Sequence, residues 1–194
     1  YRGVVCRVLP GMQSAFVEIG LQRAAFLHAA EVMACESIEQ PIPIQHVLHE
    51  GQTVMVQVIK EPIGTKGARL TTQISIAGRF LVYLPQQEHI GVSQRIEDET
   101  EREQLKARLL SLLPSNREGG YIIRTMSENA TDAELLADID YLIKTWGHIR
   151  TKGTTADARS LIFKDLNLPM RVLRDVICAD TAVVRIDSAE TYQN

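Results

Sequence analysis

Short strand-like runs separated by turn residues dominate the first third of the chain and restrict its possible folds. The runs are rich in apolar residues, and Pro10-Gly11, Gly20 and the segment 64–67 mark turns between them. They cover residues 3–9, 14–19, 24–28, 53–60 and 69–74. Five short strands with glycine-marked corners predict a small, partly open β-barrel of the OB type.

One segment inside this region does not fit a strand. Residues 33–49 contain Pro41 and Pro43, and proline cannot donate a hydrogen bond in the middle of a sheet. We therefore expect a long loop between the third and fourth strands of the barrel.

The pattern changes after about residue 72, where helix-period segments begin to alternate with strand-like runs. Residues 80–84 form a short apolar run that predicts a strand. Residues 96–113 carry leucines at helical spacing behind an acidic first turn, and Pro114 ends this predicted helix. Residues 121–125 read as a strand whose last two side chains are polar. The alternation predicts a small α/β domain.

A second helix is marked by Thr131 and Glu134, whose spacing is that of a capping box. Its apolar stripe is expected to pack in the core, with base stacking by the tryptophan as the alternative; the stripe holds Leu135, Ile139, Leu142, Ile143 and Trp146. The polar segment 151–159 predicts a loop.

The end of the sequence predicts one more helix and one more strand. Leu168-Pro169 begins the helix, because proline is favoured in a first helical turn, and residues 183–187 read as the strand. We expect three parts: an OB-fold in residues 1–72, an α/β domain in 73–170, and a linking helix with the start of a following domain in 171–194.

Composition excludes several classes of protein. Among 194 residues, 21 Lys and Arg stand against 24 Asp and Glu, so the net charge of −3 leaves only local basic patches for any phosphate. Cys6, Cys35 and Cys178 form no CxxC pair, which favours a reducing cytoplasm over a disulfide or zinc framework. No apolar run reaches the ~18 residues of a membrane span. The opening lacks Met, so we expect an internal piece of a longer chain.

Catalytic motifs are missing from the sequence: it has no GxSxG, HExxH or phosphate-binding P-loop. His46 and His49 are too isolated to predict a metal site. The acidic runs at 97–99 and at Asp138 and Asp140 fall on predicted helices, where solvated faces and ion pairs are the expected use of carboxylates. We expect no catalytic residue and no metal site within these residues.

Binding of single-stranded nucleic acid has better support. Phe16 and Phe26 lie on neighbouring predicted strands, and Lys66 lies in the glycine-flanked loop before the last one. Exposed aromatic rings stack on bases, and a nearby ammonium meets phosphate. The alternative is that both rings belong to the core of the barrel.

Seven sequence motifs together resemble the ribonuclease E/G family, and their residues are more similar to the ribonuclease G branch of that family. Four lie in the predicted barrel and match the family's S1-type RNA-binding OB-fold: residues 1–5 (YRGVV), 12–20 (MQSAFVEIG), 25–28 (AFLH) and 64–72 (GTKGARLTT). Three lie in the α/β region and match its 5′ sensor: residues 77–82 (AGRFLV), 91–96 (GVSQRI) and 122–125 (IIRT). The resemblance covers essentially the whole chain.

The resemblance implies two binding sites. In the barrel, Phe16, Phe26 and Lys66 would clamp single-stranded RNA, while Ile19 stands where other members carry a further aromatic.

In the sensor, a 5′-monophosphate would be held by four residues: the Arg124 guanidinium, the Thr125 hydroxyl and the backbone amides of Gly78 and Val82. The structural alternative pairs Arg124 with Asp138 or Asp140 to pin a strand to a helix.

The resemblance also implies the activity of the parent protein. It would be a cytoplasmic, homo-oligomeric endoribonuclease of rRNA processing and mRNA decay that cuts by Mg²⁺-assisted hydrolysis, with its catalytic aspartates outside these residues. A non-catalytic RNA-binding adaptor, or a purely structural OB-fold scaffold, stays open on the sequence alone.

Overall fold

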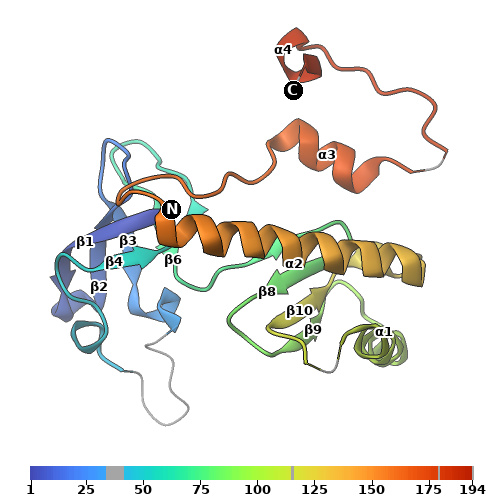
Figure 1. The fold of residues 1–194 in the computed structure, drawn as a ribbon, viewed down its shortest axis with the longest axis horizontal. Helices are drawn as coiled ribbons and strands as arrows, with labels where there is room; N and C mark the ends of the chain where they lie inside the picture. Colours follow the sequence, from blue (N-terminus) through green and yellow to red (C-terminus); the bar gives the residue numbers. More distant parts are fainter. Residues whose placement is uncertain (34–41, 115, 179, 194) are drawn as a thin grey trace. The chain divides into compact units, whose positions relative to one another are not determined.

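The computed structural model describes residues 1–33, 42–114, 116–178 and 180–193. It divides into two compact units, Tyr1–Phe163 and Lys164–Asn194, which are coloured along the chain in Figure 1. Much of the loop expected at 33–49 lies outside the described residues. Its described end forms a short 3-10 turn, Ile44–His46, whose Ile44 side chain is fully buried.

The first sheet of the larger unit is a curled, six-stranded half-barrel (Figure 1). Its strand order is β4-β1-β2-β3-β6-β5, and all neighbours are antiparallel except β3 and β6. The strands are β1 (Arg2–Leu9), β2 (Ser14–Glu18), β3 (Ala25–His28), β4 (Thr53–Met55), β5 (Gln57–Lys60) and β6 (Arg69–Thr71). The predicted run 53–60 is thus two strands that break at Val56, which is buried in the barrel core. Within the described residues, 3-10 turns form at Pro10–Met12, Ala29–Glu31 and Ile44–His46.

The barrel core follows from the two-residue period of its strands. Alternate side chains of β2 and β3 are fully buried, namely those of Ala15, Val17, Ala25 and Leu27. The intervening side chains point to the other face of the sheet, because successive residues of a strand alternate between faces. The predicted OB-fold is confirmed as the architecture of this region.

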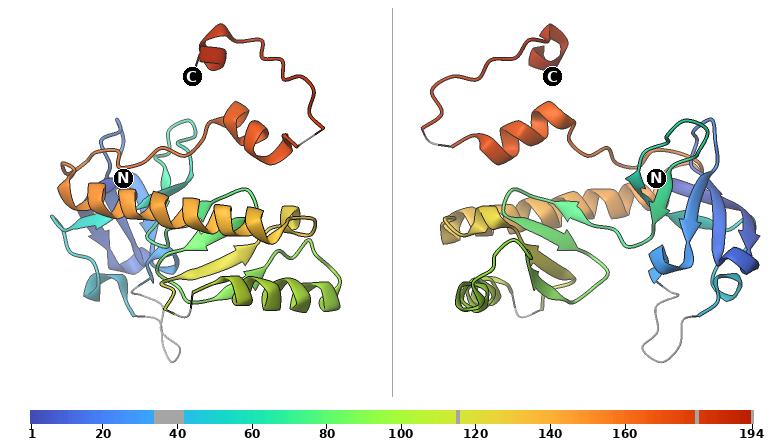
Figure 2. Two further views of the ribbon diagram at one scale, coloured as in Figure 1. Left: turned by 45° about the vertical axis from the view of Figure 1, so that its right-hand side comes forward. Right: turned by 180° about the vertical axis from the view of Figure 1, so that it is seen from behind.

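The second sheet has four strands in the order β7-β8-β10-β9, with β9 and β10 parallel and the other pairs antiparallel. They are β7 (Ile76–Ala77), β8 (Leu81–Leu84), β9 (Ile90–Val92) and β10 (Gly120–Ile123). Two helices flank this sheet in Figure 2, α1 (Glu99–Leu112) and α2 (Asp132–Thr155). Leu105 and Leu109 of α1 and most of the apolar stripe of α2 enter one core with the inner side chains of the sheet. This is the small α/β region that the sequence predicts.

The ends of both helices have identifiable causes. Asp98 caps α1 by accepting from the Glu101 amide at 3.0 Å, and α1 ends just before Pro114. At α2, Glu134 accepts from the Thr131 amide and hydroxyl, while the Thr131 hydroxyl accepts from the Glu134 amide. The predicted capping box is confirmed, and its bonds to Thr131 lower the pKa of the Glu134 carboxyl.

The loop predicted at 151–159 is wrong for its first five residues, because α2 continues to Thr155. The end of α2 packs on the barrel: a Cβ at Gly153 would meet the Met55 methyl group. The Arg2 guanidinium also donates to the carbonyls of Thr154 and Ala156, which satisfies orphan acceptors at a helix end. Tertiary contacts therefore extend a helix that local polarity would have stopped.

Two further expectations are corrected. Ile143 is exposed on α2 and does not belong to the packed stripe, whereas Trp146 is half-buried against the core. Residues 183–187 form no strand. A strand needs a hydrogen-bonded neighbour, and the described part of the smaller unit contains none.

The smaller unit contains α3 (Leu168–Val176) and α4 (Ala189–Gln193). Asn167 caps α3 by accepting from the Met170 amide at 3.1 Å, and Pro169 lies in its first turn as predicted. Among the described residues, no helix of either unit is long and apolar enough to cross a membrane.

Candidate nucleic-acid interface

Phe16 and Phe26 lie side by side on the outer face of the barrel. They are direct cross-strand partners on β2 and β3, and their ring centroids are 6.0 Å apart with the planes inclined at 68°. Both rings are half-buried, while their chain neighbours Ala15, Val17 and Leu27 are fully buried. The pair is thus on the opposite face from the core, and each ring keeps exposed surface on which a base could stack.

Lys66 is exposed in the loop that joins β5 to β6. The loop is fixed at both sides: the Arg23 guanidinium donates to the Thr65 carbonyl, and the Phe26 amide donates to the Ala68 carbonyl at 2.7 Å. Lys66 is therefore two residues before Ala68, whose backbone is hydrogen-bonded to that of Phe26. Among the described residues, no carboxylate forms an ion pair with the Lys66 ammonium. Ile19 is fully buried, so it offers no further stacking surface.

In the α/β region, the turn between β7 and β8 is built around a buried carboxylate. Asp138 of α2 accepts from three consecutive backbone amides, those of Arg79 at 3.0 Å and of Phe80 and Leu81 at 2.9 Å. A Cβ at Gly78 would lie 2.5 Å from both Asp138 oxygens. Glycine at position 78 therefore allows the carboxylate to approach the turn.

Arg124 and Ser127 hold the same turn through its carbonyl groups. The Arg124 guanidinium donates to the carbonyls of Gly78 and Arg79, the latter at 2.9 Å. The Arg124 amide and the Ser127 hydroxyl both donate to the Phe80 carbonyl, at 2.9 and 2.6 Å. The turn is bonded through its amides to α2 and through its carbonyls to the end of β10.

The four predicted sensor residues are only partly brought together as donors. Gly78 and Arg124 are in contact, and Thr125 follows Arg124 at the start of a 3-10 turn, Thr125–Ser127. The Gly78 amide donates to the Leu81 carbonyl at 2.8 Å, inside the turn. Val82 lies within β8, opposite Ile122 on one side and Ala77 on the other.

Asp138 is the site residue whose role the sequence did not reveal. The sequence predicts a solvated face or ion pairs for Asp138 and Asp140, but Asp138 is buried, whereas Asp140 is exposed and pairs with Lys144 at 2.6 Å. The available signal was position: Asp138 falls on the stripe of Leu135 and Leu142, and a lone charge on a packing face needs a partner.

No metal site is formed within the described residues, where no three His, Cys, Asp or Glu side chains come together. His46 and His49 are both exposed. The acidic run 97–99 is divided between roles, because Asp98 caps α1 and Glu99 pairs with Arg102 at 3.5 Å.

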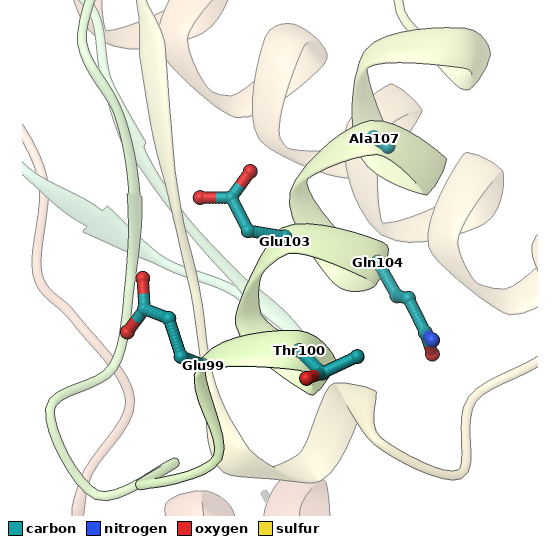
Figure 3. A pocket seen from close by; sticks show the side chains of 5 residues that line it. All are labelled: Glu99, Thr100, Glu103, Gln104 and Ala107. Atoms are coloured by element: carbon teal, nitrogen blue, oxygen red, sulfur yellow. The ribbon is translucent and has the colours of Figure 1, made fainter.

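A shallow hollow lies over the first turns of α1 and is lined by Glu99, Thr100, Glu103, Gln104 and Ala107 (Figure 3). All five residues belong to one helix, so within the described part of the chain no second element closes the hollow. Its two carboxylates would repel phosphate. None of the predicted binding residues lines it.

An OB-type barrel with an outward aromatic pair and a lysine loop belongs to a class of folds that binds oligonucleotides or oligosaccharides. Comparison with known proteins gives the family. Residues 75–194 match the model of the Ribonuclease E/G family. The whole chain is 45% identical to Ribonuclease G of Escherichia coli K12, and 97% of it is 45% identical to Ribonuclease G of Haemophilus influenzae.

A more distant relative is Ribonuclease E of a Nostoc species, 36% identical over 97% of the chain. The chain spans 41% and 40% of the two Ribonuclease G relatives and 27% of the Nostoc protein. The chain belongs to the Ribonuclease E/G family.

Proposed function

We propose that this chain is the RNA-recognition part of a 5′-end-dependent endoribonuclease. The observation that best supports the proposal is the outward Phe16–Phe26 pair beside the exposed Lys66. Bases of a single strand would stack on the rings at about 1–3 kcal/mol each, and the ammonium would meet a phosphate. Stacking tolerates any base, so the barrel would contribute affinity more than sequence choice.

The second part of the proposal is that the RNA's 5′-monophosphate binds beside Arg124. A guanidinium and a hydroxyl can satisfy the oxygens of a terminal phosphate, whereas a 5′-hydroxyl end leaves those donors without an anion. Asp138 supports this site, because the three hydrogen bonds that it accepts fix the turn to which Arg124 donates. The Gly78 amide would have to leave the Leu81 carbonyl to join the phosphate site, and the Val82 amide would be its fourth donor.

For the parent protein we propose a cytoplasmic, homo-oligomeric endoribonuclease of rRNA processing and mRNA decay. The names and sequence identities of the relatives support the ribonuclease activity, while the location, the oligomeric state and the RNA-processing roles are what the family resemblance implies. Mg²⁺ would serve hydrolysis in that protein, but the described residues do not fit a metal site. We therefore assign no step of the reaction to these residues.

The test is binding of one oligoribonucleotide with a 5′-monophosphate or a 5′-hydroxyl to the chain and to its Arg124→Gln variant. Loss of a charge-assisted contact should weaken binding of the 5′-monophosphate oligoribonucleotide by about 1.5–3 kcal/mol, roughly ten- to a hundredfold. Binding of the hydroxyl end should stay nearly unchanged.

Arg108→Gln is the matched control, because Arg108 also donates to a backbone carbonyl, that of Ala130, and to a carboxylate, that of Asp132. It should leave the preference for a 5′-monophosphate intact. Equal losses for the two ends in Arg124→Gln would mean that Arg124 only supports the fold.

A further inference from the structure

Four residues form a row across the outer face of the barrel. Arg7 of β1 is the register partner of Phe16, Phe16 that of Phe26, and Phe26 that of Arg69. Directly opposite residues on neighbouring strands share a face of the sheet. With strands about 4.8 Å apart, the row extends about 14 Å, with a cation at each end and two rings between them.

A β-bulge places Arg7 in this row. Val5 pairs with Val17 and Arg7 pairs with Phe16, so Cys6 is an additional residue in β1. Val5 is fully buried, and simple alternation would turn Cys6 outward and Arg7 towards the core. The bulge instead exposes Arg7 beside Phe16. Bulges often redirect a side chain next to a functional site.

Other arginines of the barrel are already engaged by the protein. Arg2 and Arg23 donate to backbone carbonyls, and Arg69 pairs with Glu31 at 3.1 Å. In the part of the chain that the structure describes, no hydrogen bond or ion pair involves the exposed Arg7 guanidinium.

The two carboxylates that interact electrostatically with the adjacent Cys6, those of Glu18 and Glu50, have partners of their own. Glu50 accepts from the Val8 amide at 3.3 Å, and Glu18 pairs with Arg159 at 2.5 Å. An exposed cation that the fold neither pairs nor buries, next to an aromatic platform, is suited to an external anion.

We propose that Arg7 is a further RNA-phosphate contact and defines the β1 end of the binding surface. This inference rests on the proposed function, since it needs a single-stranded RNA whose bases stack on Phe16 and Phe26. The RNA then crosses the strands: bases lie over the two rings, one flanking phosphate meets Arg7, and phosphates on the β6 side meet Lys66.

The test uses the whole chain and a 5′-hydroxyl single-stranded oligoribonucleotide, so that recognition of a 5′-phosphate does not contribute. Affinity is measured over a range of salt concentrations for Arg7→Gln, Arg7→Lys, Phe26→Ala and Lys152→Gln. Arg7→Gln should bind about tenfold more weakly. The slope of log affinity against log salt should fall by about 0.7, the value for one lost contact to a single strand. Arg7→Lys should keep the slope.

Lys152→Gln removes the same charge from an exposed position on α2 and should leave affinity nearly unchanged. If it weakens binding as much as Arg7→Gln, the effect is one of net charge and the Arg7 contact is rejected. If Phe26→Ala weakens binding while Arg7→Gln changes neither affinity nor slope, the Arg7 contact is rejected and the proposed function stands. If Phe26→Ala also has no effect, the RNA platform itself is wrong. Thermal melts confirm that each variant is folded.

Discussion

The barrel and the α/β region hold their candidate binding residues in opposite ways. On the barrel, Phe16 and Phe26 project from a sheet whose core lies on its other face, and Lys66 is exposed in the loop between β5 and β6. In the α/β region, Arg124 and Gly78 are bonded to the protein itself, around a turn fixed by Asp138. The outer face of a sheet can carry binding side chains with little effect on stability. A turn needs other residues to fix its conformation before its groups can bind a ligand.

This difference separates stability from binding. A substitution on the barrel's outer face should change affinity for RNA and leave the free energy of unfolding nearly constant. A substitution at the turn should change both, because the same contacts that would position a phosphate also close the fold.

The largest effect is expected for Asp138→Asn. An amide has nearly the same size as the carboxylate, but it has only one acceptor oxygen and presents donors to backbone amides that need an acceptor. Charge-assisted bonds are lost and at least one buried amide is left unsatisfied, so we expect about 3 kcal/mol less stability. Urea denaturation measures the change.

Asp140→Asn is the control on the same helix, since Asp140 is exposed and, among the described residues, pairs only with Lys144. Its loss should cost no more than about 0.5 kcal/mol. If the two variants are equally stable, the turn is not held by Asp138, and the contrast between the two regions disappears.

The next effect is expected on RNA affinity. Phe16→Ala and Phe26→Ala should each weaken binding of a single-stranded oligoribonucleotide by about 1–3 kcal/mol. Because both rings are on the outer face, the loss of stability should stay well below the ~3–5 kcal/mol of a buried phenylalanine. A binding titration and a thermal melt on the same samples measure the two quantities.

Leu27→Ala provides the opposite case one residue along β3. Leu27 is fully buried, and its truncation should cost about 2–5 kcal/mol of stability. RNA affinity should be kept as long as the variant is folded. If the melting temperature drops as far in Phe26→Ala as in Leu27→Ala, the Phe26 ring belongs to the core of the barrel and not to its outer face.

Much of this fold could be predicted from local pattern. Glycine and proline turns separate the barrel strands, and the capping box of Thr131 and Glu134 marks the start of α2, because these signals act over a few residues. The end of α2 could not be predicted, since Arg2 and Met55, about 100 residues or more earlier in the chain, support its last turn. The prediction of a strand at 183–187 was wrong for the same reason, because a strand depends on pairing with residues that can be distant in the sequence.

The candidate site shows the same division. Position on neighbouring predicted strands and the family resemblance together pointed to Phe16 and Phe26, and the structure places both rings on the outer face. The exposure of Arg7 depends on a β-bulge. The bulge is visible in the pairing of β1 with β2, but not in the sequence of β1 alone. Asp138 stands on an apolar stripe, but which amides it would meet depends on the fold of residues 78–81.

The smallest effect is expected for Thr125→Val, which tests whether the Thr125 hydroxyl takes part in binding a phosphate. The substitution keeps the shape of the side chain and removes its hydroxyl. No hydrogen bond within the described residues involves that hydroxyl, so stability should change by less than about 0.5 kcal/mol.

If the hydroxyl donates to a 5′-monophosphate, affinity for the phosphorylated oligonucleotide should fall by about 1.5 kcal/mol, roughly tenfold, with the 5′-hydroxyl oligonucleotide unaffected. Thr100→Val, at an exposed position on α1, should change neither. Because Thr125 has no comparable duty in holding the turn, this variant isolates binding in a region where Arg124 combines binding with support. An unchanged preference for the monophosphate in Thr125→Val would remove the hydroxyl from the sensor and leave the charge of Arg124 as its only proposed side-chain contact.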